Sequence, residues 1–202
     1  MTPPLDDAST SIPAIAPPSP EQVLDRAVDA ALSLAADRPW RDIALRDIAQ
    51  VAGVPVAALY ARAPGKAALM SRLAARQDSA ALAVIEGDPS AAPHDRLFEA
   101  FMARIETLEP NRDALIAIVR AEGAVLARLL PRTTRALAEG AGVDTSGARG
   151  ALRLAALTAV WARTLQVWRD DEGALNRTMA EIDKRLKEAD RRLSRLRAGW
   201  SD

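Results

Sequence analysis

The sequence contains no cysteine and a single histidine, His94. Without cysteine there can be no disulfide and no thiolate chemistry, and one imidazole cannot form a cluster of metal ligands. There is also no glycine-rich loop of the kind that cradles phosphate groups. We therefore expect no catalytic residue, no metal site, no cofactor and no enzymatic activity, and we assign His94 a structural or solvated role.

Segments that would direct the chain to or across a membrane are missing as well. The N-terminus lacks a basic stretch followed by an apolar one, as in a signal peptide, and no run of about 18 uncharged apolar residues occurs. The formal net charge is zero, so no global field draws the protein to DNA or to acidic lipid. A cytoplasmic protein is expected.

Aromatic residues make up only 3% of the chain, and runs of β-branched residues are short. About half of the residues are hydrophobic (49%), and alanine and leucine dominate among them. This composition favours helices, so the expected fold class is all-α. The first 20 residues contain six prolines, which rule out a regular helix, and we interpret residues 1–20 as a disordered arm.

Local signals around Gly53 predict a helix-turn-helix. Leu45, Ile48 and Ala49 recur at i, i+3 and i+4, which places them on one face of a short helix. Gly53 readily adopts the left-handed conformation that ends a helix, and Pro55 suits the first turn of the next one. Two short helices joined by such a turn form a helix-turn-helix, whose second helix can enter the DNA major groove.

In this region the chain resembles the TetR family of bacterial one-component repressors. That resemblance implies a three-helix helix-turn-helix unit at residues 21–86 and a helical ligand-binding and dimerisation domain at residues 93–200. Gly87-Asp88-Pro89 would separate the two. The residues that carry the resemblance are the amphipathic helix Val23 to Ala36, Trp40, Leu45-Arg46-Asp47-Ile48-Ala49, Ala52-Gly53-Val54, Leu59-Tyr60, Lys66 and Leu69.

The resemblance places the recognition helix at Pro55 to Tyr60, where no Arg, Lys, Asn or Gln is available to read base edges. Val56 and Ala57 could contact only thymine methyl groups. Tyr60 and Lys66 match positions at which the family contacts phosphate. The expected DNA-binding residues are Arg46, Val56, Ala57, Tyr60, Arg62 and Lys66, and the expected partner is operator DNA.

The second half offers large side chains for a ligand pocket and apolar stripes for a dimer interface. The family uses this half for both purposes, so we expect a small apolar effector or lipid and a homodimer. One stripe runs from Leu154 to Trp168 and another from Leu175 to Trp200, with steps of alternately four and three residues. The expected ligand-binding residues are Phe98, Phe101, Met102, Trp161 and Trp168.

A second resemblance leaves an alternative function open. Part of the C-terminal half is similar to lipid-binding accessory proteins of ubiquinone biosynthesis, which share the TetR fold and are not repressors. A continuous, basic, amphipathic last helix from Ala174 to Gly199, ending near Trp200, would suit peripheral membrane contact through residues 174–200. The segments that carry this resemblance are Ala159-Val160-Trp161, Val167-Trp168-Arg169-Asp170-Asp171-Glu172, Thr178-Met179 and Ile182-Asp183-Lys184-Arg185.

Overall fold

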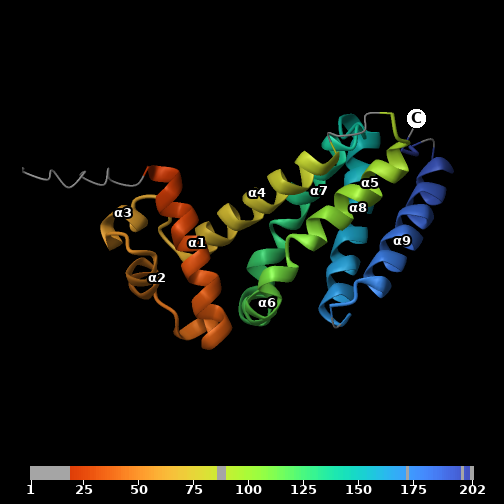
Figure 1. Cartoon of the computed structure of the whole chain (residues 1–202). Helices are drawn as coiled ribbons and strands as arrows, with labels where there is room; N and C mark the ends of the chain where they lie inside the picture. The colour runs from red at the N-terminus through yellow and green to blue at the C-terminus, as the bar shows by residue number, and fades with distance from the viewer. Residues whose placement is uncertain (1–18, 86–89, 172, 197, 201–202) are drawn as a thin grey trace, which may run out of the picture.

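The computed structural model describes residues 19–85, 90–171, 173–196 and 198–200 (Figure 1). Every regular element in these residues is helical, which confirms the all-α prediction. Most of the expected disordered arm, the Gly87-Asp88-Pro89 separator and Glu172 lie outside the described residues.

The first helix, α1 (Pro20–Asp37), is capped by its own first residues, so Ser19 and Pro20 do not belong to the expected disordered arm. Ser19 and Gln22 form a reciprocal capping box, in which each side chain accepts a hydrogen bond from the other residue's backbone N–H, at 2.8 and 3.3 Å. Pro20 occupies the first turn, where its missing N–H has no consequence. The apolar face of α1 is buried through Val23, Ala27, Val28, Ala30, Ala31, Leu32 and Ala35.

The helix-turn-helix is confirmed as α2 (Leu45–Ala52) and α3 (Val56–Tyr60). Gly53 ends α2 with φ 63° and ψ 37°, the left-handed conformation that its position required. Ile48, Ala49 and Leu59 are fully buried and attach both helices to α1. Before α2, the short 3₁₀ turn η1 (Trp40–Asp42) buries Trp40, which is 2% exposed.

The long helix α4 (Lys66–Ile85) connects the two ends of the molecule (Figure 1). Arg72 and Arg76 in its first half form ion pairs with Asp25 and Asp29 of α1. Its second half packs against the helices that follow. Because α4 belongs to both packing units, the division into residues 21–86 and 93–200 stays a prediction.

The remaining helices form the larger bundle in Figure 1. Helix α6 ends at Ala127, and Pro131 lies in the first turn of α7, where a proline is tolerated. Asp171 accepts hydrogen bonds from the backbone N–H and the hydroxyl of Thr178 in the first turn of the last helix. The elements are α5 (Pro93–Glu106), η2 (Glu109–Asn111), α6 (Arg112–Ala127), α7 (Leu130–Gly140), α8 (Gly147–Arg169) and α9 (Asn176–Ser194).

The prediction of a continuous last helix to Gly199 is wrong. Helix α9 ends at Ser194, and the chain then turns back, so that the Trp200 backbone N–H donates to Asp190 Oδ1 at 3.0 Å. Trp200 is only 5% exposed. The turn is stabilised by burial of the Trp200 indole ring and by hydrogen bonds from Arg153 of α8.

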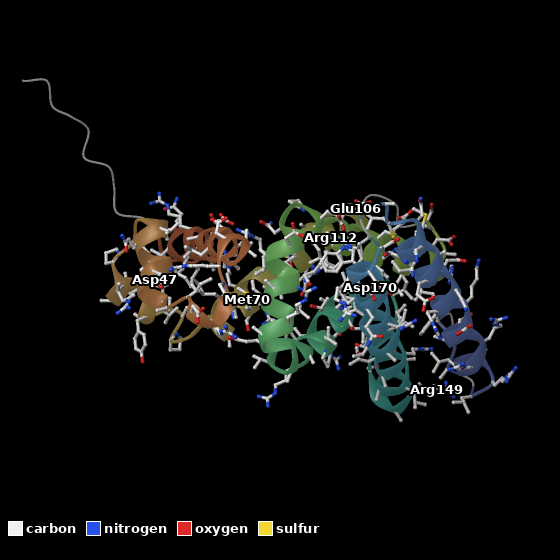
Figure 2. The ribbon with its side chains drawn as sticks, turned by 90° about the horizontal axis from the view of Figure 1, so that it is seen from below. Asp47, Met70, Glu106, Arg112, Arg149 and Asp170 are labelled. Carbon is white, nitrogen blue, oxygen red and sulfur yellow. The ribbon has the colours of Figure 1, made fainter. Side chains whose placement is uncertain are left out.

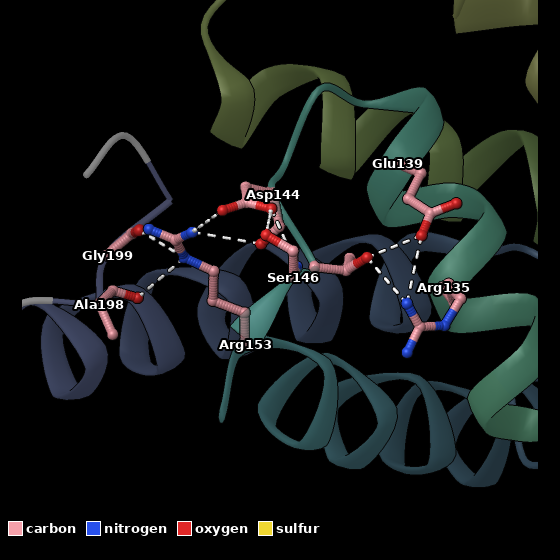
Figure 3. A network of polar contacts seen from close by, with 8 residues as sticks. Arg135, Glu139, Asp144, Ser146, Arg153, Ala198 and Gly199 are labelled. Carbon is pink, nitrogen blue, oxygen red and sulfur yellow. Dashed lines mark hydrogen bonds and ion pairs between the residues drawn. The ribbon is translucent and has the colours of Figure 1, made fainter. Parts of the chain in front are cut away.

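Arg153 on α8 is 1% exposed and binds the returning chain end (Figure 3). Its Nε donates to the carbonyl oxygens of Ala198 and Gly199 at 3.2 and 2.9 Å, and its Nη1 donates to that of Asp144 at 3.2 Å. A buried guanidinium needs such acceptors, because leaving its N–H groups unpaired is costly. The C-terminal turn is therefore part of the folded core.

The apolar stripes of α8 and α9 are largely used within one chain. Leu157, Trp161 and Trp168 of α8 are buried, as are Ile182 and Leu186 of α9, and the two helices pack against each other. Leu154 is half-buried, and Met179 and Leu196 are 44% and 64% exposed, so neither stripe is fully covered by one chain. Their use as a dimer interface stays a prediction.

Candidate functional site

The surface formed by α2 and α3 presents small and apolar side chains outward. Val56 is 47% and Tyr60 60% exposed, and Ala57 lies exposed between them. Val51 of α2 adds a further exposed apolar side chain, at 55%. Because Leu59 is buried behind them, the orientation of α3 is fixed by the core, and its outer face is free to contact a partner.

Two of the predicted basic residues also lie on this surface. Arg46 is exposed, with its Nε 3.6 Å from Asp47 Oδ1, and Arg62 is exposed with its Nη1 donating to the carbonyl oxygen of Ala58. The Asp47 carboxylate accepts the Ala44 backbone N–H at 2.9 Å at the start of α2. That hydrogen bond and the nearby arginines lower the pKa of Asp47, which keeps the carboxylate charged.

Lys66 differs from the other predicted DNA-binding residues, because its side chain turns inward. Its Nζ donates to the carbonyl oxygen of Trp40 at 2.7 Å and lies 4.6 Å from the centre of the Trp40 ring. Lys66 thus ties the start of α4 to the buried turn η1. A phosphate contact by Lys66 stays a prediction, and it would require exchange of this hydrogen bond.

A mainly apolar cavity of about 120 Å³ lies between α4, α5, α6, α7 and α8. Trp161 and Trp168 line it, as two of the predicted ligand-binding residues. Met70 of α4 also lines it, at the junction between the helix-turn-helix end and the larger bundle in Figure 2. The remaining lining residues are Leu73, Ala74, Gln77, Arg104, Leu108, Leu115, Ile118, Val119, Leu126, Leu129, Leu130, Thr133 and Leu165.

The structure places the other three predicted ligand-binding residues outside the lining of this cavity. Phe101 is fully buried and packs edge-on against Trp161, with ring centres 5.2 Å apart and an interplanar angle of 64°. Met102 is also buried in the core, at 8% exposed. Phe98 lies in a separate depression beside α9, near His94, whose Nε2 is 3.5 Å from Asp183 Oδ1.

Sequence reasoning missed the polar group in the cavity wall. Arg104 and Asp78 are each 5% exposed and form an ion pair, with Nε donating to Oδ1 at 2.7 Å. Thr133 donates to the other carboxylate oxygen at 3.0 Å, and Arg104 Nη1 donates to the Thr107 hydroxyl at 3.2 Å. Burial lowers the pKa of Arg104, and the adjacent Asp78 opposes that shift.

A signal for this group exists in the sequence, since Arg104 falls at helical spacing between the apolar residues Phe101 and Leu108. A charged residue within an apolar stripe indicates a buried, paired group. Its partner could not be read from the sequence, because Asp78 lies on a different helix.

A second hollow of about 390 Å³ adjoins the cavity between α6 and α8. We call it the α6–α8 groove. Gly123 lines it, directly after Glu122, whose φ of −132° and ψ of 27° interrupt the helical geometry of α6. The residues shared by the cavity and the groove are Val119, Leu126, Leu130, Leu165 and Trp168.

The interrupted turn of α6 contacts the helix-turn-helix end directly. The indole N–H of Trp40 donates to Glu122 Oε1 at 2.9 Å, and α6 packs against both α1 and η1. Trp40 in turn holds Lys66 at the start of α4. A continuous set of contacts therefore connects the cavity wall with the elements that support α2 and α3.

Within the described residues, His, Cys, Asp and Glu side chains form no group of three or more that could hold a metal ion. In the same part of the chain, no helix is both long enough and apolar enough to cross a membrane.

The geometry defines a class: an all-helical protein with an N-terminal helix-turn-helix on a larger helical bundle that contains a mainly apolar cavity. Comparison with known proteins narrows that class. Residues 27–73 match the profile of the bacterial regulatory proteins of the tetR family. No curated protein matches the sequence.

Two solved structures share the fold over most of their length. The TetR transcriptional regulator from Nitrosomonas europaea ATCC 19718 is 22% identical, with a TM-score of 0.66 over 82% of this chain and 96% of that chain. A TetR transcriptional regulator from Rhodococcus sp. RHA1 is 15% identical, with a TM-score of 0.63 over 83% of this chain and 95% of that chain. The N-terminal part therefore matches the tetR family profile, and the chain shares the fold of two TetR regulators, so the expected resemblance is confirmed.

Proposed function

We propose that the protein is a ligand-responsive transcriptional regulator that binds operator DNA as a homodimer. The observation that carries this proposal is the exposed outer face of α3, fixed in orientation by the buried Leu59 and the Gly53 turn. Such an element can enter a major groove while Arg46 and Arg62 beside it contact phosphates. Isolation of the genomic DNA that the protein binds tests the proposal, and binding that does not depend on sequence would refute it.

The chemistry of α3 predicts how that DNA is read. Val56 and Ala57 offer methyl groups and no hydrogen-bond donor, so direct contact with bases is apolar and favours the thymine methyl. Replacing thymine by uracil at a contacted position should weaken binding about 4-fold for each methyl lost, from roughly 0.8 kcal/mol per buried carbon. Competition assays with uracil-substituted operators measure this effect. Uracil placed outside the protected half-sites serves as the control, and equal loss at both places would contradict apolar readout.

A homodimer would use the outer face of α8 and α9, since their inner faces pack on each other. Leu152 of α8 is 47% exposed, and Leu196, in the turn after α9, is 64% exposed and lines a groove of about 360 Å³ between the two helices. Small side chains at Ala156 and Ala159 line this groove and would allow a second copy to approach closely. The same symmetric interface would set the distance between two α3 helices.

Sedimentation at micromolar concentration should give twice the chain mass of 21.6 kDa. Ala159→Arg should shift the protein to monomer, because a long cation in the groove would oppose its own copy across a two-fold axis. Ala80→Arg, at an exposed alanine of α4, is the matched control and should leave the dimer intact. A wild-type monomer would refute the dimer.

The Trp40–Glu122 contact is our candidate for the link between ligand and DNA binding. Glu122→Ala should lower the free energy of unfolding by about 1–3 kcal/mol, since it leaves a buried indole N–H without an acceptor. Glu122→Gln keeps an acceptor and should lower the free energy of unfolding by less than half as much. Chemical denaturation measures both changes in stability, and the rate of hydrogen exchange at Trp40 to Asp42 should rise only in the alanine variant. Equal loss of stability in the two variants would argue against the Trp40–Glu122 hydrogen bond.

The alternative role as a membrane-associated lipid carrier loses two of its grounds in the structure. Trp200 is buried and not at a helix end facing outward. Two cations of α9 are paired with carboxylates: Arg185 with Glu181 and Glu188, and Lys187 with Asp183. We therefore do not propose membrane contact through residues 174–200.

A further inference from the structure

We propose that the cavity binds an uncharged, largely apolar molecule with one hydrogen-bond acceptor, such as a ketone, and that Arg104 binds this acceptor. The inference rests on the proposed ligand-responsive function and specifies the chemical class of its effector. It depends on three features of the site: a buried donor, a balanced local charge and the size of the enclosed space.

The donor is the guanidinium of Arg104, in the cavity wall. Its Nε is used by Asp78 and its Nη1 by Thr107, whereas no contact among the described residues engages Nη2 in a hydrogen bond. A donor of a side chain that is only 5% exposed gains free energy from an acceptor in the cavity. The surrounding wall is mainly apolar, so a bound molecule would find its main polar partner here.

The charge of the site favours a neutral acceptor over an anion. Asp78 is 2.7 Å from Arg104 and balances its charge, and both carboxylate oxygens already accept hydrogen bonds, from Arg104 and Thr133. A second carboxylate would lie near Asp78 in a desolvated cavity, where like charges repel strongly and hydration is lost. A carbonyl oxygen meets the Arg104 donor without that cost.

The dimensions point to a single ring with a short chain. The space beside Arg104 is about 120 Å³, somewhat less than the roughly 150 Å³ of a cavity that accommodates benzene, so a ring held there would extend partly into the α6–α8 groove. The α6–α8 groove, with about 390 Å³, continues from this space past Leu126 and Leu165 and would hold an alkyl chain. A ring substituent of several carbons would therefore extend along α6 toward Gly123, next to the Glu122 contact with Trp40.

Three probes of matched shape test the proposal on the full-length protein: 4-butylacetophenone, butylbenzene and 4-butylbenzoate. Calorimetric titration or thermal shift should show the ketone binding at least about 10-fold more tightly than the other two, as expected for one added hydrogen bond to a charged donor. Equal affinity of butylbenzene would overturn the role of Arg104. Tighter binding of the benzoate would overturn the preference for a neutral ligand, and no binding of any probe would overturn the proposed class.

Two variants of α8 localise the site. Leu165→Trp fills the junction of cavity and groove and should abolish ketone binding, while Leu154→Trp, half-buried elsewhere on the same helix, should leave it unchanged. Ketone binding that survives Leu165→Trp in a folded protein would overturn the location.

Operator binding by the same preparations is measured separately. Selective ketone binding without any change in operator affinity would leave this inference standing and refute the ligand response. A protein that binds its operator but does not prefer the ketone would overturn this inference and leave the proposed operator binding standing.

Discussion

Replacing Trp200 with alanine is expected to lower the free energy of unfolding by about 3–5 kcal/mol, the range for truncating a buried large aromatic side chain. Trp200 is 5% exposed, although only two residues follow it in the sequence. The ring packs into the core, while the backbone before it is held by Arg153. Loss of the ring would therefore also weaken the anchoring of the buried guanidinium.

Chemical denaturation of the full-length protein measures this effect, with Val84→Ala as the control. Val84 lies on α4, outside the proposed dimer interface, and is 59% exposed, so its truncation should change the free energy of unfolding by less than about 0.5 kcal/mol. If both substitutions lower the free energy of unfolding by the same small amount, the ring of Trp200 is not packed in the core. A surface helix with a free terminal tryptophan would then regain support, and flotation with anionic vesicles would be its direct test.

Leu196 and Trp200 belong to one apolar pattern in the sequence, yet Leu196 is 64% exposed and Trp200 is buried. Hydrophobic periodicity therefore does not predict the structure of this segment. The steps of four and three residues run without a break from Leu175 to Trp200, and they predict one long helix. The chain leaves that helix after Ser194 because Arg153, about 45 residues earlier, supplies donors to the carbonyl groups of the turn. Hydrophobic periodicity carries no information about such a distant partner.

The N-terminal part could be predicted because its signals are local. Ser19 and Gln22 cap α1 across three residues, and Gly53 ends α2 through its own backbone conformation. The same reasoning places Val56, Ala57 and Tyr60 on an exposed surface, and the structure confirms that exposure. Each of these features depends on residues within about one helical turn, so tertiary packing had little opportunity to change it.

The cavity shows the opposite case. Its position depends on five helices, and large aromatic residues alone do not identify its lining: Trp161 and Trp168 reach it, whereas Phe101 supports Trp161 from behind. The chemically informative residue is Arg104, which composition and aromatic content do not reveal. Its importance follows only once Asp78 and Thr133, from two other helices, are seen beside it.

Removal of that ion pair's cation gives the other large expected effect. Arg104→Met should lower the free energy of unfolding by about 3–5 kcal/mol, because it leaves the Asp78 carboxylate charged and buried, with the Thr133 hydroxyl as its one remaining hydrogen-bond partner in the described part of the chain. Arg76→Met is the control: Arg76 pairs with Asp29 at the surface, where such pairs contribute about 0–1 kcal/mol. Urea titrations of the three proteins under identical conditions provide the comparison.

The double variant Asp78→Asn, Arg104→Met separates the ion pair from simple packing. Asparagine can still accept the Thr133 hydrogen bond but carries no charge, so the double variant should be more stable than Arg104→Met alone. A double variant that is less stable than either single one, by the sum of their losses, would show that the two side chains act independently. In that case the 2.7 Å contact would contribute only through packing, and the neutrality of the cavity would lose its structural basis.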